Sequence, residues 1–230
     1  MTEQKVPVRS FQIVADKGCN LPPWLIRRFG IHIFPIDNIY NIEEDILFIS
    51  STTDIGTYRH MIETTHGELT ARNPHLNYHF VDSRSAGIGY GRLLMEACEL
   101  REDAVGMDET YQWVLDNRGR VCQWFLRSEA GGVEPSLLHI NDSGAIVERS
   151  DKLAGLDALL HIFKNTAHKP YNKHSASIMH ANNLKIAEEL ATLLAEQCEV
   201  TKPMLIEMED VLAQKLGEGA VGLVFWGDQR

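Results

Sequence analysis

Residues 11–23 have the sequence Phe-Gln-Ile-Val-Ala-Asp-Lys-Gly-Cys-Asn-Leu-Pro-Pro, in which a β-branched and aromatic run passes into turn formers and then into prolines. Residues 81–89, Val-Asp-Ser-Arg-Ser-Ala-Gly-Ile-Gly, and 217–225, Gly-Glu-Gly-Ala-Val-Gly-Leu-Val-Phe, again join such a run to small residues. A buried strand followed by a loop and a helix is the unit of a parallel α/β sheet, where ligands bind at the strand ends. Because these segments contain no obvious nucleophile, base or metal cage, they predict a protein that holds a ligand rather than transforms one.

The same strand, loop and helix order is repeated through the first half of the chain. Strands are expected at 11–15, 31–36, 45–50 and 78–82, and helices at 21–28, 57–69 and 89–100. A further helix at 107–118 precedes a strand at 121–126. This repetition predicts an N-terminal lobe built on a mainly parallel sheet with helices on both faces.

The second half predicts another lobe. A stretch rich in turn formers at 127–136 marks the passage between the lobes, which we expect to span 1–130 and 131–230. A hairpin at 137–149 turns at Asn-Asp-Ser-Gly, and helices are expected at 153–165 and 184–198. With strands at 175–180, 203–208 and 221–226, this lobe is expected to be α/β or α+β with a smaller sheet.

Composition narrows the class of protein. The chain has 230 residues, 44% of them hydrophobic, and a formal net charge of -10, which argues against a nucleic-acid-binding surface. Its 4 cysteines are far apart and form no C-x-x-C pair, so we expect free thiols in a reducing compartment. No run approaches the roughly 18 apolar residues of a membrane span, and the polar start lacks a secretory signal. We therefore expect a cytoplasmic location.

Five segments, taken in order, resemble the DegV family, bacterial fatty-acid-binding proteins of which some carry the acyl group for a fatty acid kinase. They are 15–22 (Ala-Asp-Lys-Gly-Cys-Asn-Leu-Pro), 51–58 (Ser-Thr-Thr-Asp-Ile-Gly-Thr-Tyr), 80–89 (Phe-Val-Asp-Ser-Arg-Ser-Ala-Gly-Ile-Gly), 180–183 (His-Ala-Asn-Asn) and 217–222 (Gly-Glu-Gly-Ala-Val-Gly). The resemblance covers nearly the whole chain and implies a shortened, divergent member.

The chain also departs from the family pattern. The Thr-Ser-Gln-Pro segment that helps to hold the carboxylate in the family is missing between the second and third expected strands. The family's Gly-Gly-Arg-Ile element shrinks to residues 131–135. Lys17 stands where the family has a serine, and Lys215 stands where it has a histidine. Recognition of the head group is therefore altered.

The resemblance implies a ligand-binding set at the loops. Its members are Asp16, Lys17, Ser51, Thr52, Thr53, Asp82, Ser83 and Lys215. Hydroxyl groups can donate hydrogen bonds to a carboxylate, and a lysine ammonium is a compact partner for an anion. Three plainer interpretations stay open: the loop at 51–56 caps a helix, the lysines are solvated, and Asp82 caps the next helix.

Other motifs are weaker. The run Gly-Ile-Gly-Tyr-Gly at 87–91 has the wrong spacing for a dinucleotide fingerprint, and we attribute it to close approach of a helix to the sheet. His161, His168 and His174 lack the spacing of a ligand pair, so no metal site is expected. We expect no catalytic residues and no cofactor.

These observations give one leading hypothesis and two alternatives. The first is a non-catalytic protein that binds a fatty acid or similar amphiphile between its lobes and, by resemblance, presents it to a kinase subunit. Each buried methylene of such a ligand contributes about 0.8 kcal/mol. The alternatives are a degenerate member without ligand that acts through protein contacts, and a small-molecule phosphoryl-transfer enzyme. The latter would lack both a P-loop and a pair of carboxylates for magnesium.

Overall fold

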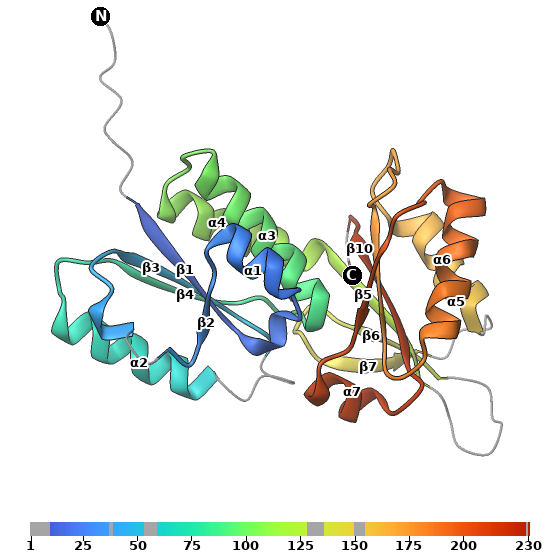
Figure 1. Cartoon of the computed structure of the whole chain (residues 1–230), viewed down its shortest axis with the longest axis horizontal. Helices are drawn as coiled ribbons and strands as arrows, with labels where there is room; N and C mark the ends of the chain where they lie inside the picture. The colour runs from blue at the N-terminus through green and yellow to red at the C-terminus, as the bar shows by residue number, and fades with distance from the viewer. Residues whose placement is uncertain (1–9, 37–38, 53–58, 128–135, 150–154, 229) are drawn as a thin grey trace, which may run out of the picture.

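The computed structural model describes residues 10–36, 39–52, 59–127, 136–149, 155–228 and 230. Two β-sheets lie side by side, with helices around and between them (Figure 1). Sheet A is parallel and has the order β2 (His32–Phe34), β1 (Phe11–Asp16), β3 (Asp45–Ser50) and β4 (Tyr78–Asp82).

Helices cover both faces of sheet A. They are α1 (Pro23–Phe29), α2 (Arg59–Arg72), α3 (Gly87–Glu102) and α4 (Met107–Asn117), with short 3-10 turns η1 (Lys17–Cys19), η2 (Ile39–Asn41) and η3 (Arg118–Arg120). Successive residues of a strand point to opposite faces. Ile13 accordingly packs in the core with α1 and α3, and Val14 packs with Ile62 and Leu69 of α2. The predicted sheet and its two helical layers are confirmed.

Sheet B has the order β7 (Ile146–Arg149), β6 (Ser136–Ile140), β5 (Val121–Arg127), β10 (Val221–Trp226), β8 (Ala176–His180) and β9 (Met204–Glu207). Its pairs are antiparallel except β8 with β9. The two-lobed α/β prediction is confirmed, but the prediction that the second lobe has the smaller sheet is wrong. Sheet B is the larger sheet, with 6 strands against 4 among the described residues. β5, which the predicted boundary assigned to the first lobe, pairs with β6 and β10 instead.

The predicted boundary itself, between residues 130 and 131, lies outside the described residues and stays a prediction. The hairpin expected at 137–149 is present as β6 and β7.

Helix α3 forms the layer between the two sheets. Tyr90 of α3 is fully buried, and its hydroxyl donates to the Ile49 carbonyl and accepts a hydrogen bond from the Asp16 amide. The same core includes Phe125 and Met179 from sheet B. Gly89 permits this close approach, because a Cβ there would lie 2.3 Å from the Gln123 side chain. The interpretation of the 87–91 glycines as a helix-to-sheet contact is confirmed.

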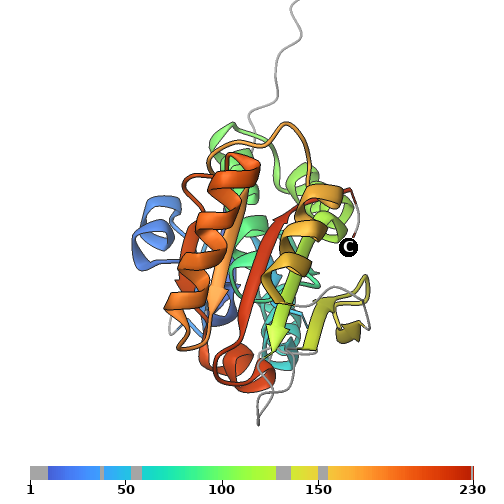
Figure 2. The same ribbon diagram turned by 90° about the vertical axis from the view of Figure 1, so that its right-hand side faces the viewer.

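The opposite face of sheet B is covered by α5 (Gly155–Thr166) and α6 (Leu184–Cys198), which lie side by side across its strands in Figure 2. Their apolar residues pack with Phe225 and Ile178 of the sheet in a second core. Helix α7 (Asp210–Leu216) follows β9 in the chain, and its Leu212 and Leu216 belong to the same core as Tyr90 and Phe125. The molecule thus stacks sheet A, α3, sheet B and the α5–α6 pair in successive layers.

Candidate functional site

Several of the predicted site residues meet where the strands of sheet A end. Asp16 is the last residue of β1 and is only 1% exposed. Its carboxylate accepts hydrogen bonds from the Gly18 amide at 2.8 Å, the Ser51 amide at 2.8 Å and the Ser51 hydroxyl at 3.0 Å. Burial raises the pKa of Asp16, and the hydrogen bonds from Ser51 and Gly18 oppose that rise. The Asp16 carboxylate and the Ser51 amide and hydroxyl therefore serve as hydrogen-bond partners for one another.

Thr52 makes a contact with the second lobe. Its hydroxyl donates to the Gly144 carbonyl at 2.8 Å, and its amide donates to the Ser85 carbonyl at 2.8 Å. Gly144 lies in the turn between β6 and β7 with φ of 90°, and a Cβ there would be 2.3 Å from the Thr52 hydroxyl. Only glycine accommodates both that φ value and that distance. The hairpin turn of sheet B therefore packs directly on the end of β3.

Asp82 and Ser83 stabilise the loop that follows β4. The Asp82 carboxylate accepts a hydrogen bond from the Arg84 amide at 2.7 Å. Ser83 is fully buried and its hydroxyl accepts from the Ser85 amide at 3.1 Å. The alternative that Asp82 caps α3 is wrong, because the N-cap of that helix is Ala86 and it has no side-chain cap.

The remaining predicted site residues that the structure describes do not take part in these buried contacts at the strand ends. Lys17 lies in η1 and Lys215 in the last turn of α7, and both side chains are exposed. Thr53 lies outside the described residues, as does the expected helix start at Thr57. We use the name strand-end cluster for Asp16, Ser51, Thr52, Ser83 and Ser85. Their hydroxyls and carboxylate bond to protein groups, and whether they also bind a ligand stays a prediction.

Two residues of this region were missed by the sequence reasoning. Gln123 of β5 bonds both backbone groups of Ala86, accepting from its amide at 3.0 Å and donating to its carbonyl at 2.7 Å. Burial lowers the pKa of Arg230 to about 10. The Arg230 guanidinium donates to the Ser85 hydroxyl and to the carbonyls of Arg84, Arg118, Val121 and Asn141. Backbone carbonyls carry no sequence signature, so no residue pattern could have indicated this contact.

A mostly apolar pocket of about 290 Å³ lies on the other face of sheet B, between the sheet and the N-terminal ends of α5 and α6. We call it the α5–α6 pocket. It is lined by Leu126, Gly155, Leu156, Asn183, Ile186, Glu189, Gly219 and Val221. None of the seven predicted site residues that the structure describes lines it, but Gly219 belongs to the glycine motif at 217–222.

The chemistry of these residues suits binding. Leu126 and Val221 form buried apolar parts of the pocket, and the Asn183 side chain donates to the Gly219 carbonyl at 2.7 Å. Within the described part of the chain, no three histidine, cysteine or acidic side chains gather as a metal site would require. The described helices include none with the length and apolarity needed to cross a membrane.

The fold and the pocket define a two-lobed α/β protein with an apolar cavity beside its second sheet. Comparison with known proteins shows which proteins the chain is similar to. A DegV domain-containing protein of Clostridium perfringens is 24% identical over 206 residues, covering 80% of this chain and 70% of the relative. No family model matches the chain.

Solved structures agree. A fatty-acid-binding DegV family protein from Streptococcus agalactiae has a TM-score of 0.76 at 16% identity, covering 96% of this chain and 100% of the other. A DegV family protein from Eubacterium eligens, loaded with heptadecanoic acid, has a TM-score of 0.78 at 12% identity, covering 95% and 100%. These matches confirm the resemblance: the chain has the DegV fold and is related in sequence to a DegV domain-containing protein.

Proposed function

We propose that this protein binds a fatty acid or similar amphiphile in the cytoplasm, without transforming it, and holds the acyl tail in the α5–α6 pocket. The single observation that supports this most strongly is that apolar pocket, in a fold whose solved examples include proteins described as fatty-acid-binding. Its volume of about 290 Å³ is near the lower end of ordinary ligand pockets, about 300–1,000 Å³. Each methylene that enters contributes about 0.8 kcal/mol.

The hypothesis from the sequence is that the acyl tail lies between the lobes. Much of the space there is filled by core side chains packed around α3, among them Tyr90, Phe125 and Met179, and the pocket beside Arg92 is lined partly by charged groups. We therefore assign the tail to the other face of sheet B.

The carboxylate needs a polar neighbour at the rim of the pocket. In the part of the chain that the structure describes, no side chain caps the first turn of α6, because Asn183 bonds the Gly219 carbonyl instead. The first backbone N–H groups of a helix have no intrahelical partner and attract anions. Lys185, exposed in the same turn, adds positive charge. We assign the carboxylate to this turn, with the strand-end cluster as the competing location.

Extraction of the natively purified chain with organic solvent, followed by mass spectrometry, tests the proposal. We expect acyl chains to copurify with the folded protein or to exchange in when a fatty acid is added. If no acyl chain copurifies and none exchanges in, the proposal fails.

Two substitutions then locate the ligand. Ile186→Trp fills the pocket and should abolish binding of the acid, whereas Glu188→Trp puts the same ring at an exposed position outside the pocket and should not. Thr52→Val removes the hydroxyl that the resemblance assigns to the head group, and we expect binding to persist. A loss with Thr52→Val as large as with Ile186→Trp would move the carboxylate to the strand-end cluster.

By the family resemblance, we propose a fatty acid kinase subunit as the partner that receives the bound acid. The loaded chain should support ATP-dependent formation of acyl phosphate by such a kinase, and the Ile186→Trp variant should not. Equal product with both chains would remove the kinase from the proposal.

One observation favours a second candidate, a member that has lost its ligand and acts through protein contacts. The hydroxyls of Ser51 and Thr52 already donate to Asp16 and to the Gly144 carbonyl, so neither is available for a carboxylate unless that bond breaks. A lipid-free extract and no exchange would support this candidate.

A further inference from the structure

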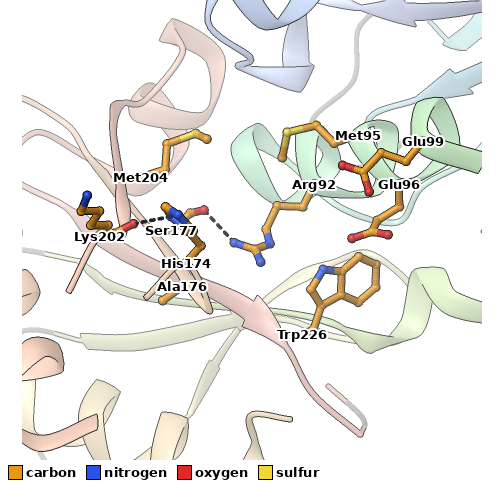
Figure 3. Close-up of a pocket in the computed structure, with 10 residues that line it drawn as sticks. All are labelled: Arg92, Met95, Glu96, Glu99, His174, Ala176, Ser177, Lys202, Met204 and Trp226. Atoms are coloured by element: carbon orange, nitrogen blue, oxygen red, sulfur yellow. Dashed lines mark hydrogen bonds between the residues drawn. The ribbon is translucent and has the colours of Figure 1, made fainter. Parts of the chain in front are cut away.

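A separate pocket of about 180 Å³ lies between α3 and the strands β8, β9 and β10 (Figure 3). We call it the Arg92 pocket. Among the described residues, it shares no lining residue with the α5–α6 pocket and contains none of the site residues predicted from the sequence. Its volume is below that of ordinary drug-sized ligand sites, about 300–1,000 Å³. The space suits one small molecule.

Arg92 of α3 points into this pocket with hydrogen-bonding capacity left over. Its Nη1 donates to the Ser177 hydroxyl at 3.0 Å, a neutral partner. Its Nε is buried and has no hydrogen-bond partner among the described residues. Burial also lowers the pKa of Arg92 to about 10. A guanidinium offers a planar fork of donors that matches a carboxylate, so a ligand carboxylate would satisfy the buried Nε.

The other end of the pocket is acidic. Glu96 follows one turn later on α3, and Glu99 lies next to it. Figure 3 shows both carboxylates on the side of Arg92 away from Ser177. Burial raises the pKa of Glu96, Glu99 adds to that rise, and Arg92 opposes it. An ammonium placed here would pair with two carboxylates.

Apolar side chains complete the walls. Trp226 lies beside Glu96, and its ring is held by an edge contact with Trp113, with ring centroids 6.1 Å apart. Met95 and Met204 line the same pocket. Methionine adapts its shape to different ligands. The pocket therefore combines a donor fork, an acidic end and an adjustable apolar wall within a small volume.

We infer that the Arg92 pocket binds a small zwitterion with an apolar side chain, an α-amino acid. The carboxylate pairs with Arg92 beside Ser177, the ammonium faces Glu96 and Glu99, and the side chain packs on Trp226 and the methionines. Lys202 and His174 also line the pocket, but a simple carboxylic acid or a phosphate carries no cation that could pair with the two glutamates. This site is independent of the proposed fatty-acid site, and its test does not involve the acyl pocket.

Calorimetry of the full chain at pH 7 with three matched probes tests this. The probes are L-leucine, 4-methylpentanoate, which lacks the amino group, and 3-methylbutylamine, which lacks the carboxylate. We expect L-leucine to bind and each analogue to bind at least about tenfold more weakly, the change for one lost charged hydrogen bond. Equal binding of L-leucine and 4-methylpentanoate, or no binding of L-leucine, would overturn the inference.

Charge-removing variants sharpen the test. Arg92→Met should weaken L-leucine and 4-methylpentanoate but leave 3-methylbutylamine unchanged. Glu96→Gln should weaken L-leucine and 3-methylbutylamine but leave 4-methylpentanoate unchanged. Arg101→Met, on the same helix but outside the pocket, is the matched control and should leave the binding of all three probes unchanged. If Arg92→Met does not fold, Arg92→Lys keeps the charge and removes the fork. L-leucine binding unchanged by either Arg92 variant would contradict the assignment.

Discussion

The strand-end cluster and the Arg92 pocket both place polar groups between the lobes, but they differ in whether those groups are satisfied. Asp16 accepts three hydrogen bonds from Gly18 and Ser51. Arg92 has one neutral partner and a buried Nε with none among the described residues. A satisfied buried group stabilises the fold, whereas an unsatisfied donor that faces a cavity can form a hydrogen bond with a ligand that enters it. The comparison predicts large stability effects at the first region and small ones at the second.

The largest effect is expected from Asp16→Ala. Removing the carboxylate leaves three donors without an acceptor, two of them buried, and we expect a loss of about 3 kcal/mol or more in the free energy of unfolding. Asp16→Asn, which keeps one acceptor oxygen, should lose less. Urea denaturation measures both, with the exposed Asp116→Ala as the control, expected within about 0.5 kcal/mol of the parent. Equal stability of Asp16→Ala and the control would mean that this carboxylate does not hold the strand ends together.

The next effect concerns the contact between the lobes at Gly144. Gly144→Ala puts a Cβ against the Thr52 hydroxyl at a backbone φ that disfavours side chains, and we expect a loss of about 2 kcal/mol. Gly119→Ala is the matched control, since a Cβ there meets nothing within 4 Å. It should be neutral or stabilising by up to about 1 kcal/mol. Similar stabilities of the two variants would show that the hairpin turn moves away from Thr52 without penalty.

Sequence patterns predicted local elements well and contacts between lobes poorly. The apolar runs in β1 and β3 and the glycine that ends α1 are local signals, so the elements of sheet A could be predicted. The pairing of β5 with β10 joins residues about a hundred positions apart, and no local pattern encodes it. The candidate site divides in the same way between local and long-range features. The loops that contain Ser51 and Ser83 are local, and they could be predicted from motifs.

What the motifs could not indicate is which groups the loop residues bond. The Thr52 partner is a backbone carbonyl of another lobe, and Arg230 bonds mainly carbonyls. Arg92 had no signal at all, because one arginine on an amphipathic helix resembles a solvated surface residue. Only packing of α3 against sheet B reveals that its guanidinium is enclosed.

A smaller effect is expected from Arg92→Met on stability, as distinct from binding. The substitution removes one hydrogen bond to Ser177 but also removes the desolvation penalty of a buried charge. Replacing buried charges by apolar side chains of similar size is often neutral or stabilising. We expect a change within about 1 kcal/mol in either direction by urea denaturation without ligand. A loss as large as that of Asp16→Ala would make Arg92 a structural residue and remove the contrast between the two regions.

The smallest effect is a pH dependence at Asp16. Burial raises the pKa of this carboxyl above its ordinary value of 3.8, so the folded state retains a proton that the unfolded state has released. The free energy of unfolding then falls as the pH rises from 3.8 through the folded pKa, and becomes level above it. Asp16→Asn removes this slope, so the stability difference between parent and variant should fall over that window. A difference that instead rises with pH would mean that the hydrogen bonds from Ser51 and Gly18 outweigh desolvation, and that the strand-end cluster favours the ionised carboxylate.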